Sequence, residues 1–194
     1  MSGRSVRSGL VLLIVAVLAV LSGCSGSKGG PEKSGSEFRF VEGTPSGEVI
    51  AKADRKNAPE ITGKLLDDAS FDLADHDGKI VVLNFWASWC APCRVEIPDL
   101  IQIASTYGPD GVELVGVLVK DSKDQGEAYA KQVGMTYPSI FDPKATVALR
   151  FRGFSVPALP STIVIDKQGK VAAVFVSKVE LADLTSTTEK LLAE

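Results

Sequence analysis

The sequence has little charge imbalance, few cysteine and histidine residues, and no apolar run of the length that a transmembrane helix needs. Its 21 lysines and arginines oppose 24 aspartates and glutamates, so the net charge of -3 gives no electrostatic reason to expect nucleic-acid binding. The apolar run at residues 10–21 has twelve residues, whereas a membrane-spanning helix needs about 20. A structural zinc normally takes four Cys or His ligands, so three cysteines and one histidine disfavour a zinc site.

The first 23 residues have the pattern of a secretory signal. Arg4 and Arg7 form a positive segment before the apolar run at residues 10–21. An uncleaved anchor helix is the alternative, although it would need Ser, Gly and Arg residues within the membrane. The sequence Leu21-Ser22-Gly23-Cys24 resembles the lipobox of bacterial lipoproteins, which implies that Cys24 is acylated and becomes the new N-terminus. We therefore expect a lipid-anchored protein on the extracytoplasmic face of the cell membrane.

The remaining chain divides into a tether and one domain. Residues 24–48 are rich in Gly, Ser, Lys and Glu and show no helical or alternating period, which predicts a flexible tether. Within it, residues 38–41 carry Phe38-Arg39-Phe40-Val41, for which a short strand or a docking segment is an alternative. Residues 49–194 have the length of one ordinary globular domain.

Apolar periodicity in this domain predicts alternating strands and helices. Residues 80–86 form a nearly continuous apolar run rich in β-branched side chains, which is typical of a strand buried on both faces. Alternation of strands with helices predicts a parallel sheet core, and short strand pairs predict hairpins at both ends of the domain. The expected strands are residues 61–66, 70–73, 80–86, 112–119, 162–165 and 170–176, and residues 137–141 are expected to form a short strand or a loop. The expected helices are residues 93–107, 122–133, 145–151 and 180–192.

Cys90 and Cys93 are three residues apart at the point where the buried strand gives way to a helix. Such a pair is half of a zinc site, an inert structural disulfide or a redox dithiol. Unpaired amides and the helix dipole stabilise a thiolate at a helix N-terminus, which favours the redox interpretation. Cys90 is then the expected nucleophile and Cys93 the resolving thiol, while Pro92 fits the first turn of the helix.

The stretch Asn84-Phe85-Trp86-Ala87-Ser88-Trp89-Cys90-Ala91-Pro92-Cys93 resembles the active-site signature of thioredoxin-like proteins, in particular the ResA/TlpA family of membrane-tethered extracytoplasmic oxidoreductases. Gly78-Lys79, Glu96-Ile97-Pro98 and the segment at residues 156–166 match that family in order, so the resemblance covers residues 58–192. It implies an α/β fold, a thioredoxin-like three-layer sandwich. This fold has a central mixed sheet, helices on both faces and an N-terminal β-hairpin extension.

The resemblance also implies roles for individual residues. Pro160 would be a cis-proline facing the dithiol, and the backbone of Leu159 would pair with a substrate strand. Trp89 and Pro92 would contact the substrate, with Trp86 either a second aromatic wall or plain core. Pro98 would kink the helix without ending it. His76 lies in a polar turn and is expected to be a solvated loop residue.

Glu96 and Asn84 are two polar residues close to the dithiol in the sequence. The resemblance implies that Glu96 lines the cavity beside the cysteines, where it would either accept a proton or raise the thiol pKa by like-charge repulsion. The alternative is a solvent-exposed carboxylate that complements the helix N-terminus. Asn84 occupies a position where cytoplasmic thioredoxins carry a buried acid, and an amide cannot accept a proton in its place.

The resemblance implies a protein-disulfide reductase that uses no cofactor beyond the Cys90–Cys93 disulfide. Its expected substrates are partner proteins with thiols or disulfides, such as apocytochrome c during cytochrome c maturation, and its electrons would come from a membrane thiol-disulfide donor. A disulfide oxidant or isomerase for secreted proteins, and a non-enzymatic lipoprotein scaffold, are the alternatives. A thiol peroxidase is disfavoured, because Ala87-Ser88-Trp89-Cys90 lacks the expected Thr-x-x-Cys setting.

Overall fold

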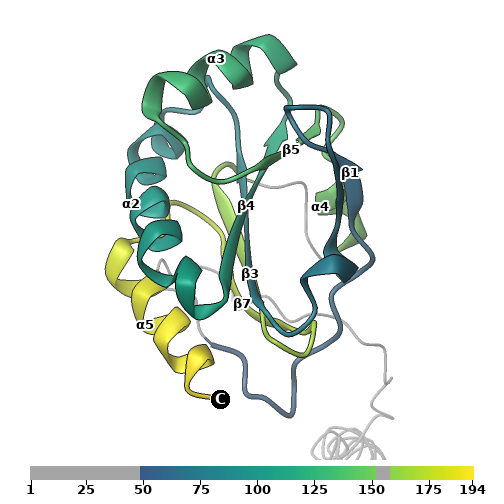
Figure 1. The fold of residues 1–194 in the computed structure, drawn as a ribbon, viewed down its shortest axis with the longest axis vertical. Helices are drawn as coiled ribbons and strands as arrows, with labels where there is room; N and C mark the ends of the chain where they lie inside the picture. The colour runs from purple at the N-terminus through teal and green to yellow at the C-terminus, as the bar shows by residue number, and fades with distance from the viewer. Residues whose placement is uncertain (1–48, 152–157) are drawn as a thin grey trace, which may run out of the picture. The chain divides into compact units, whose positions relative to one another are not determined.

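A computed structural model describes residues 49–151 and 158–194 of the chain. The predicted signal segment, the tether and Cys24 lie outside the described residues. The central element is a five-stranded sheet with the strand order β5-β4-β3-β6-β7 (Figure 1). Its strands are β3 (Ile80–Trp86), β4 (Val112–Val119), β5 (Ser139–Asp142), β6 (Ser161–Ile165) and β7 (Val171–Phe175).

The sheet is mixed, as expected from the resemblance to thioredoxin-like proteins. β4 runs parallel to β3 and β5 runs parallel to β4, whereas β6 pairs antiparallel with β3 and β7 antiparallel with β6. The parallel half confirms the expectation from strand–helix alternation, and the β6–β7 hairpin confirms the change of pattern near the C-terminal end. Because β3, β4 and β5 are parallel, their carboxyl ends meet at the same edge of the sheet.

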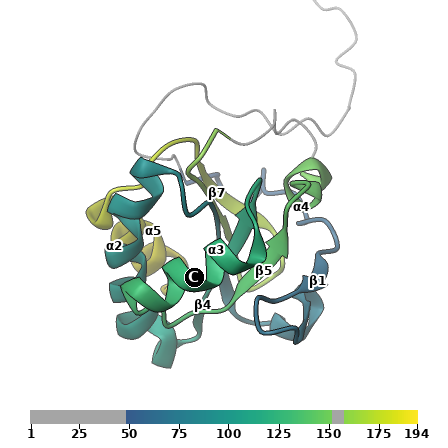
Figure 2. The same ribbon diagram turned by 90° about the horizontal axis from the view of Figure 1, so that it is seen from above.

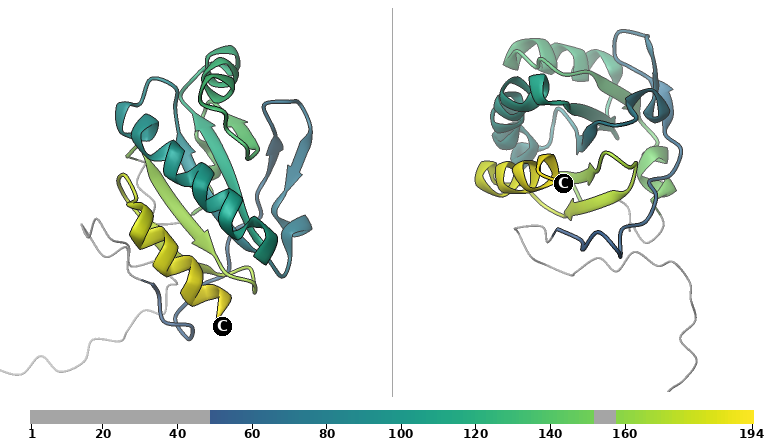
Figure 3. Two further views of the ribbon diagram at one scale, coloured as in Figure 1. Left: turned by 60° about the vertical axis from the view of Figure 1, so that its left-hand side comes forward. Right: turned by 60° about the horizontal axis from the view of Figure 1, so that its bottom comes forward.

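Helices cover both faces of this sheet. Figures 1 and 2 show α2 (Ala91–Tyr107), α3 (Lys123–Val133) and α5 (Leu181–Leu192) on one side and α4 (Thr146–Arg150) on the other. Figure 3 shows α5 running alongside α2, with which it is in contact. Alternate residues of β3 supply the two cores, because successive side chains of a strand point to opposite faces. Val82 and Trp86 pack toward the three helices, and Leu83 and Phe85 pack toward α4.

A two-stranded hairpin of β1 (Thr62–Lys64) and β2 (Ser70–Asp72) precedes the sheet. Phe71 buries its ring in the core on the α4 side, and an isolated bridge joins Leu65 to Ile140 of β5. The predicted hairpin is confirmed, but its strands are shorter than the expected 61–66 and 70–73.

α2 passes through Pro98 and ends at Tyr107, so the proline does not terminate the helix. The helix begins at Ala91, two residues earlier than the apolar spacing predicted, because Pro92 fits its first turn. Its buried side chains include Cys93, Glu96 and Ile97. Within residues 49–151 and 158–194, no helix combines the length and the apolar character that crossing a membrane requires.

Candidate active site

The loop between β3 and α2 carries the two cysteines at the carboxyl edge of the sheet. β3 ends at Trp86, and Cys90 is the N-cap of α2. Two contacts hold the loop: the amide of Ser88 donates to Asp121 Oδ2 at 2.6 Å, and the amide of Cys90 donates to the carbonyl of Ala87 at 3.1 Å. The end of a fully buried strand therefore positions Cys90 at the start of the helix.

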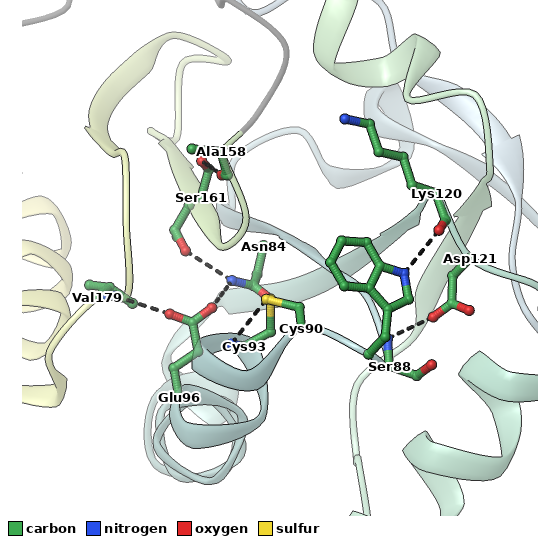
Figure 4. Close-up of a disulfide and its surroundings, with 12 residues drawn as sticks. Asn84, Ser88, Cys90, Cys93, Glu96, Lys120, Asp121, Ala158, Ser161 and Val179 are labelled. Atoms are coloured by element: carbon green, nitrogen blue, oxygen red, sulfur yellow. Dashed lines mark hydrogen bonds between the residues drawn. A yellow bond between two sulfur atoms is a disulfide. The ribbon is translucent and has the colours of Figure 1, made fainter.

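Cys90 and Cys93 form a disulfide with their Cα atoms 5.3 Å apart (Figure 4). The amide of Cys93, one of the helix N-terminal amides without an intrahelical partner, donates to Cys90 Sγ at 3.3 Å. Cys90 keeps 4% of its surface exposed and Cys93 keeps none. An incoming thiolate or disulfide therefore reaches Cys90 first, and the same amide stabilises negative charge on its sulfur.

Glu96 lies three residues after Cys93, on the same buried face of α2, and its side chain is 0% exposed. The alternative of a solvent-exposed carboxylate is therefore wrong. The Asn84 side chain donates to Glu96 Oε1 at 2.7 Å, and the amide of Val179 donates to Glu96 Oε2 at 3.0 Å. Burial raises the pKa of Glu96 to about 7, although these two hydrogen bonds oppose the shift.

Asn84 lies on β3 and is completely buried between the sheet and α2. Its Nδ2 donates to Glu96 and also to Thr162 Oγ1 of β6, at 3.0 Å. From the sequence, Asn84 was notable only because it replaces an acid. In the structure, its side-chain amide holds the carboxylate of Glu96 in place (Figure 4).

Two tryptophans precede the dithiol, and they have different environments. Trp89 is 58% exposed, and its indole N–H donates to the carbonyl of Lys120 at 3.0 Å. Trp86 is completely buried and donates to Ser139 Oγ at 2.8 Å, so the prediction of a second aromatic wall is wrong and the core alternative holds. Pro92 is exposed in the first turn of α2.

The segment before β6 reaches the same edge of the sheet. The Leu159–Pro160 peptide bond is cis, as the resemblance implied. Ser161 pairs with Phe85 in the sheet register, which places Pro160 next to the end of β3. Leu159 is half-buried and packs against both cores.

His76 is remote from this site. It lies in the 3-10 helix η1 (Leu73–His76), stacks on Phe71 with ring centroids 4.9 Å apart, and pairs with the Glu113 carboxylate. The expectation of a solvated loop residue is wrong, because the ring is half-buried between these two side chains. In the described part of the chain, no group of three His, Cys, Asp or Glu side chains gathers in the arrangement of a metal site.

Three contributors to the site were not identified from sequence. Asp121 follows β4, which is parallel to β3 and next to it. This placement could have predicted from the sequence that Asp121 lies close to the loop that carries the cysteines. Thr162 belongs to the quoted family motif, but no role was given to it. The Val179 contact uses a backbone amide, which no residue type signals.

The AhpC/TSA family matches residues 55–174 of the chain. The thiol-disulfide oxidoreductase ResA of Geobacillus thermodenitrificans is 33% identical over 144 residues, which cover 74% of this chain and 81% of ResA.

Two solved structures are similar across nearly their whole length. A DsbF homologue from Corynebacterium diphtheriae has a TM-score of 0.75 and 39% identity, covering 80% of this chain and 98% of its own. A secreted thiol-disulfide isomerase from Corynebacterium glutamicum has a TM-score of 0.74 and 35% identity, and the match covers 81% of this chain and 98% of the isomerase.

Proposed function

Because the chain belongs to the thioredoxin-fold AhpC/TSA family and is a thiol-disulfide oxidoreductase of the ResA type, we propose that it reduces disulfides of partner proteins outside the cytoplasm. The observation that carries this proposal is the Cys90–Cys93 disulfide at the N-terminus of α2, in which Cys90 keeps a small exposed fraction and Cys93 keeps none. A purely scaffolding role gives no reason for this arrangement of the two sulfurs.

The proposed reaction begins with the reduced protein. The Cys90 thiolate attacks one sulfur of the substrate disulfide, forms a mixed disulfide and releases the other substrate sulfur as a thiolate, which takes up a proton. Cys93 then loses its proton and attacks Cys90 Sγ. This step closes the Cys90–Cys93 bond and releases the second substrate sulfur, which is also protonated. Two electrons pass from the dithiol to the substrate.

Glu96 is the proposed proton acceptor for Cys93. It is buried one helical turn from this cysteine, and its pKa of about 7 lets it exchange a proton near neutral pH. Cys93 is completely buried, so a carboxylate one helical turn away is better placed than bulk solvent to take its proton in the resolving step.

The proposed substrate contacts surround Cys90. Trp89 and Pro92 are exposed beside it, and Leu159 and Pro160 approach from the segment before β6. Exposed aromatic and apolar side chains next to a nucleophile favour an extended segment of a partner protein over a small polar ligand.

The direction of electron flow separates two candidates. Reduction of apocytochrome c for haem attachment, with electrons from a membrane thiol-disulfide donor, follows from the resemblance to the ResA/TlpA family. The C. glutamicum neighbour is described as a secreted isomerase, which supports the alternative of an isomerase for secreted proteins. The reductase proposal predicts a potential near the thioredoxin value of about -270 mV, and an oxidant would lie near the DsbA value of about -120 mV.

The proposed location is the extracytoplasmic face of the membrane, through a lipid on Cys24. The lipobox-like sequence supports this proposal, as does the secreted neighbour from C. glutamicum. Metabolic labelling with a radioactive fatty acid should label the wild-type protein and leave Cys24→Ala unlabelled. Equal labelling of both proteins, or none of either, would exclude a lipid on Cys24.

Trapping the mixed disulfide tests the function itself. In Cys93→Ser cells, Cys90 should hold partner proteins covalently, and mass spectrometry of the complexes released by reductant should identify extracytoplasmic proteins with paired cysteines. Cys90→Ser is the matched control, because its remaining thiol is buried and should trap none. Absence of covalent complexes in Cys93→Ser, together with a potential near the oxidant value, would overturn the reductase proposal.

A further inference from the structure

Asn84 has one end of its side chain fully paired and the other unpaired. Its Nδ2 donates two hydrogen bonds, to Glu96 Oε1 at 2.7 Å and to Thr162 Oγ1 at 3.0 Å. An amide nitrogen carries two hydrogens, so both are used. Its Oδ1 is buried and has no hydrogen-bond partner among the described residues.

An unpaired buried acceptor loses its hydrogen bonds to water without replacement, and most buried polar atoms in native proteins are paired. The contact with Glu96 also fixes the orientation of the amide, since turning it over would bring Oδ1 against an oxygen of the ionised carboxylate. The acceptor is therefore held in place without a partner in the oxidised protein. A second state of the site that supplies a donor would remove this cost.

The residues around Asn84 point to that donor. Asn84 contacts Glu96, which lies one helical turn from Cys93 on the buried face of α2. Both Asn84 and Cys93 are completely buried, in the layer between β3 and α2. In the view of Figure 4, the amide of Asn84 lies between the Glu96 carboxylate and the sulfur atoms.

The disulfide sulfurs carry no hydrogen, but reduction changes this. Two electrons and two protons convert the Cys90–Cys93 bond into two thiols, and the proton on Cys93 makes its sulfur a buried donor. A buried S–H group needs an acceptor as much as Asn84 Oδ1 needs a donor.

We propose that Asn84 is a positioning residue whose Oδ1 accepts a hydrogen bond from the Cys93 thiol in the reduced protein, while its Nδ2 holds the carboxylate of Glu96. The inference rests on the proposed function and deepens it. Asn84 transfers no proton. It keeps the thiol beside the carboxylate. In the resolving step the S–H group turns from Asn84 Oδ1 to Glu96, which takes the proton, and Cys93 Sγ attacks Cys90 Sγ, so that the bond between Cys90 and the substrate sulfur breaks and that sulfur leaves as a thiolate.

The test is carbon NMR of the full-length protein with ¹³C-labelled asparagine, following the side-chain carbonyl carbon of Asn84. Acceptance of a hydrogen bond at Oδ1 moves this resonance downfield. The comparison uses reduced wild-type protein, Cys93→Ala, which has no donor at this position, and Cys93→Ser, whose hydroxyl is a donor of similar size. None of these proteins is altered at Asn84, so loss of folding at that position does not complicate the result.

The Asn84 resonance should lie downfield in reduced wild type and in Cys93→Ser relative to Cys93→Ala and to oxidised wild type. Equal positions in reduced wild type, Cys93→Ser and Cys93→Ala would overturn the inference. Disulfide reductase activity of the wild-type sample separates the two claims. If the protein reduces disulfides but the Asn84 resonance does not move, only the role of Asn84 is wrong. If the resonance moves but the protein does not reduce disulfides, the proposed function is wrong and the hydrogen bond stands.

Discussion

The backbone amide of Val179 donates a hydrogen bond of 3.0 Å to Oε2 of Glu96. This contact joins the loop between β7 and α5 to the buried face of the helix that carries both cysteines. Both polar partners of Glu96, this amide and Asn84 Nδ2, are donors. The two donors therefore stabilise an ionised carboxylate, while burial of Glu96 favours the protonated form.

The pH dependence of stability should show whether Glu96 binds its proton more tightly in the folded protein than in the unfolded chain. Its pKa of about 7 in the folded protein exceeds its ordinary value of 4.5, so the folded state binds this proton more tightly than the unfolded state. The associated stability is fully present below pH 4.5 and is lost as the pH rises through 7. Glu96→Gln cannot ionise. The difference in unfolding free energy between this variant and wild type should therefore change by about 3 kcal/mol in favour of the variant as the pH rises from about 4 to about 8.

Denaturant unfolding of the two oxidised proteins across this pH range measures the difference. Changed hydrogen bonding of the glutamine shifts the whole curve of the variant without altering its pH dependence. Parallel stability curves for wild type and Glu96→Gln would show that Glu96 does not titrate in this range.

Trp89→Ala should impair reaction with protein substrates and spare small disulfides. The indole is 58% exposed beside Cys90, and exposed aromatic side chains of this kind supply much of the energy of protein contacts. We expect kcat/KM for a protein disulfide to fall about tenfold, while the rate with a small aromatic disulfide stays unchanged. Trp89→Phe is the matched control, because it keeps an aromatic ring and loses only the hydrogen bond to Lys120. Equal losses with both substrate types would place the effect on the dithiol itself.

Arg55 should be important for stability and unimportant for chemistry. Its guanidinium is buried and binds Asp166 Oδ2 at 3.0 Å and both carboxylate oxygens of Glu194 at 2.7 and 2.8 Å. Arg55→Met leaves the buried Asp166 carboxylate without its cation, which should cost about 3–5 kcal/mol of unfolding free energy.

Adding Asp166→Asn to Arg55→Met should recover part of that loss in urea denaturation, because the uncompensated charge is removed. Asp166 follows β6 at the end of the sheet opposite to the cysteines, since Ile165 pairs with Val81 near the start of β3. The alkylation rate of Cys90 should therefore stay at the wild-type value in both variants. A slower rate would indicate that the network reaches the active site.

Much of the fold could be predicted from the sequence, because its strongest signals are local. The β-branched run of β3 has every residue buried, and the apolar spacing after Cys93 continues past Pro98 to Tyr107. The hairpin strands β1 and β2 have only three residues each, which is shorter than predicted. The prediction was too long because an apolar run indicates which residues are buried, and not which residues pair with another strand. Ile61 is completely buried, although it lies outside β1.

The site was predictable in its covalent part and unpredictable in its environment. The Cys90–Cys93 spacing at the end of a buried strand indicated the dithiol, and the family motif indicated Glu96. No pattern in the sequence brings Thr162 to Asn84 or Val179 to Glu96, since 78 and 83 residues separate the partners of these two contacts along the chain. Such contacts depend on how β6 and the loop before α5 pack against α2, which is a property of the tertiary structure.

The central claim is that the N-terminus of α2 makes Cys90 an acidic, accessible nucleophile. The most direct measurement is the pH dependence of alkylation of the reduced protein, with mass spectrometry of the peptides to separate Cys90 from the other cysteines. Cys90 should react before Cys93, with a midpoint below the value of about 8.5 for free cysteine. A midpoint at or above that value, or earlier modification of Cys93, would contradict the account.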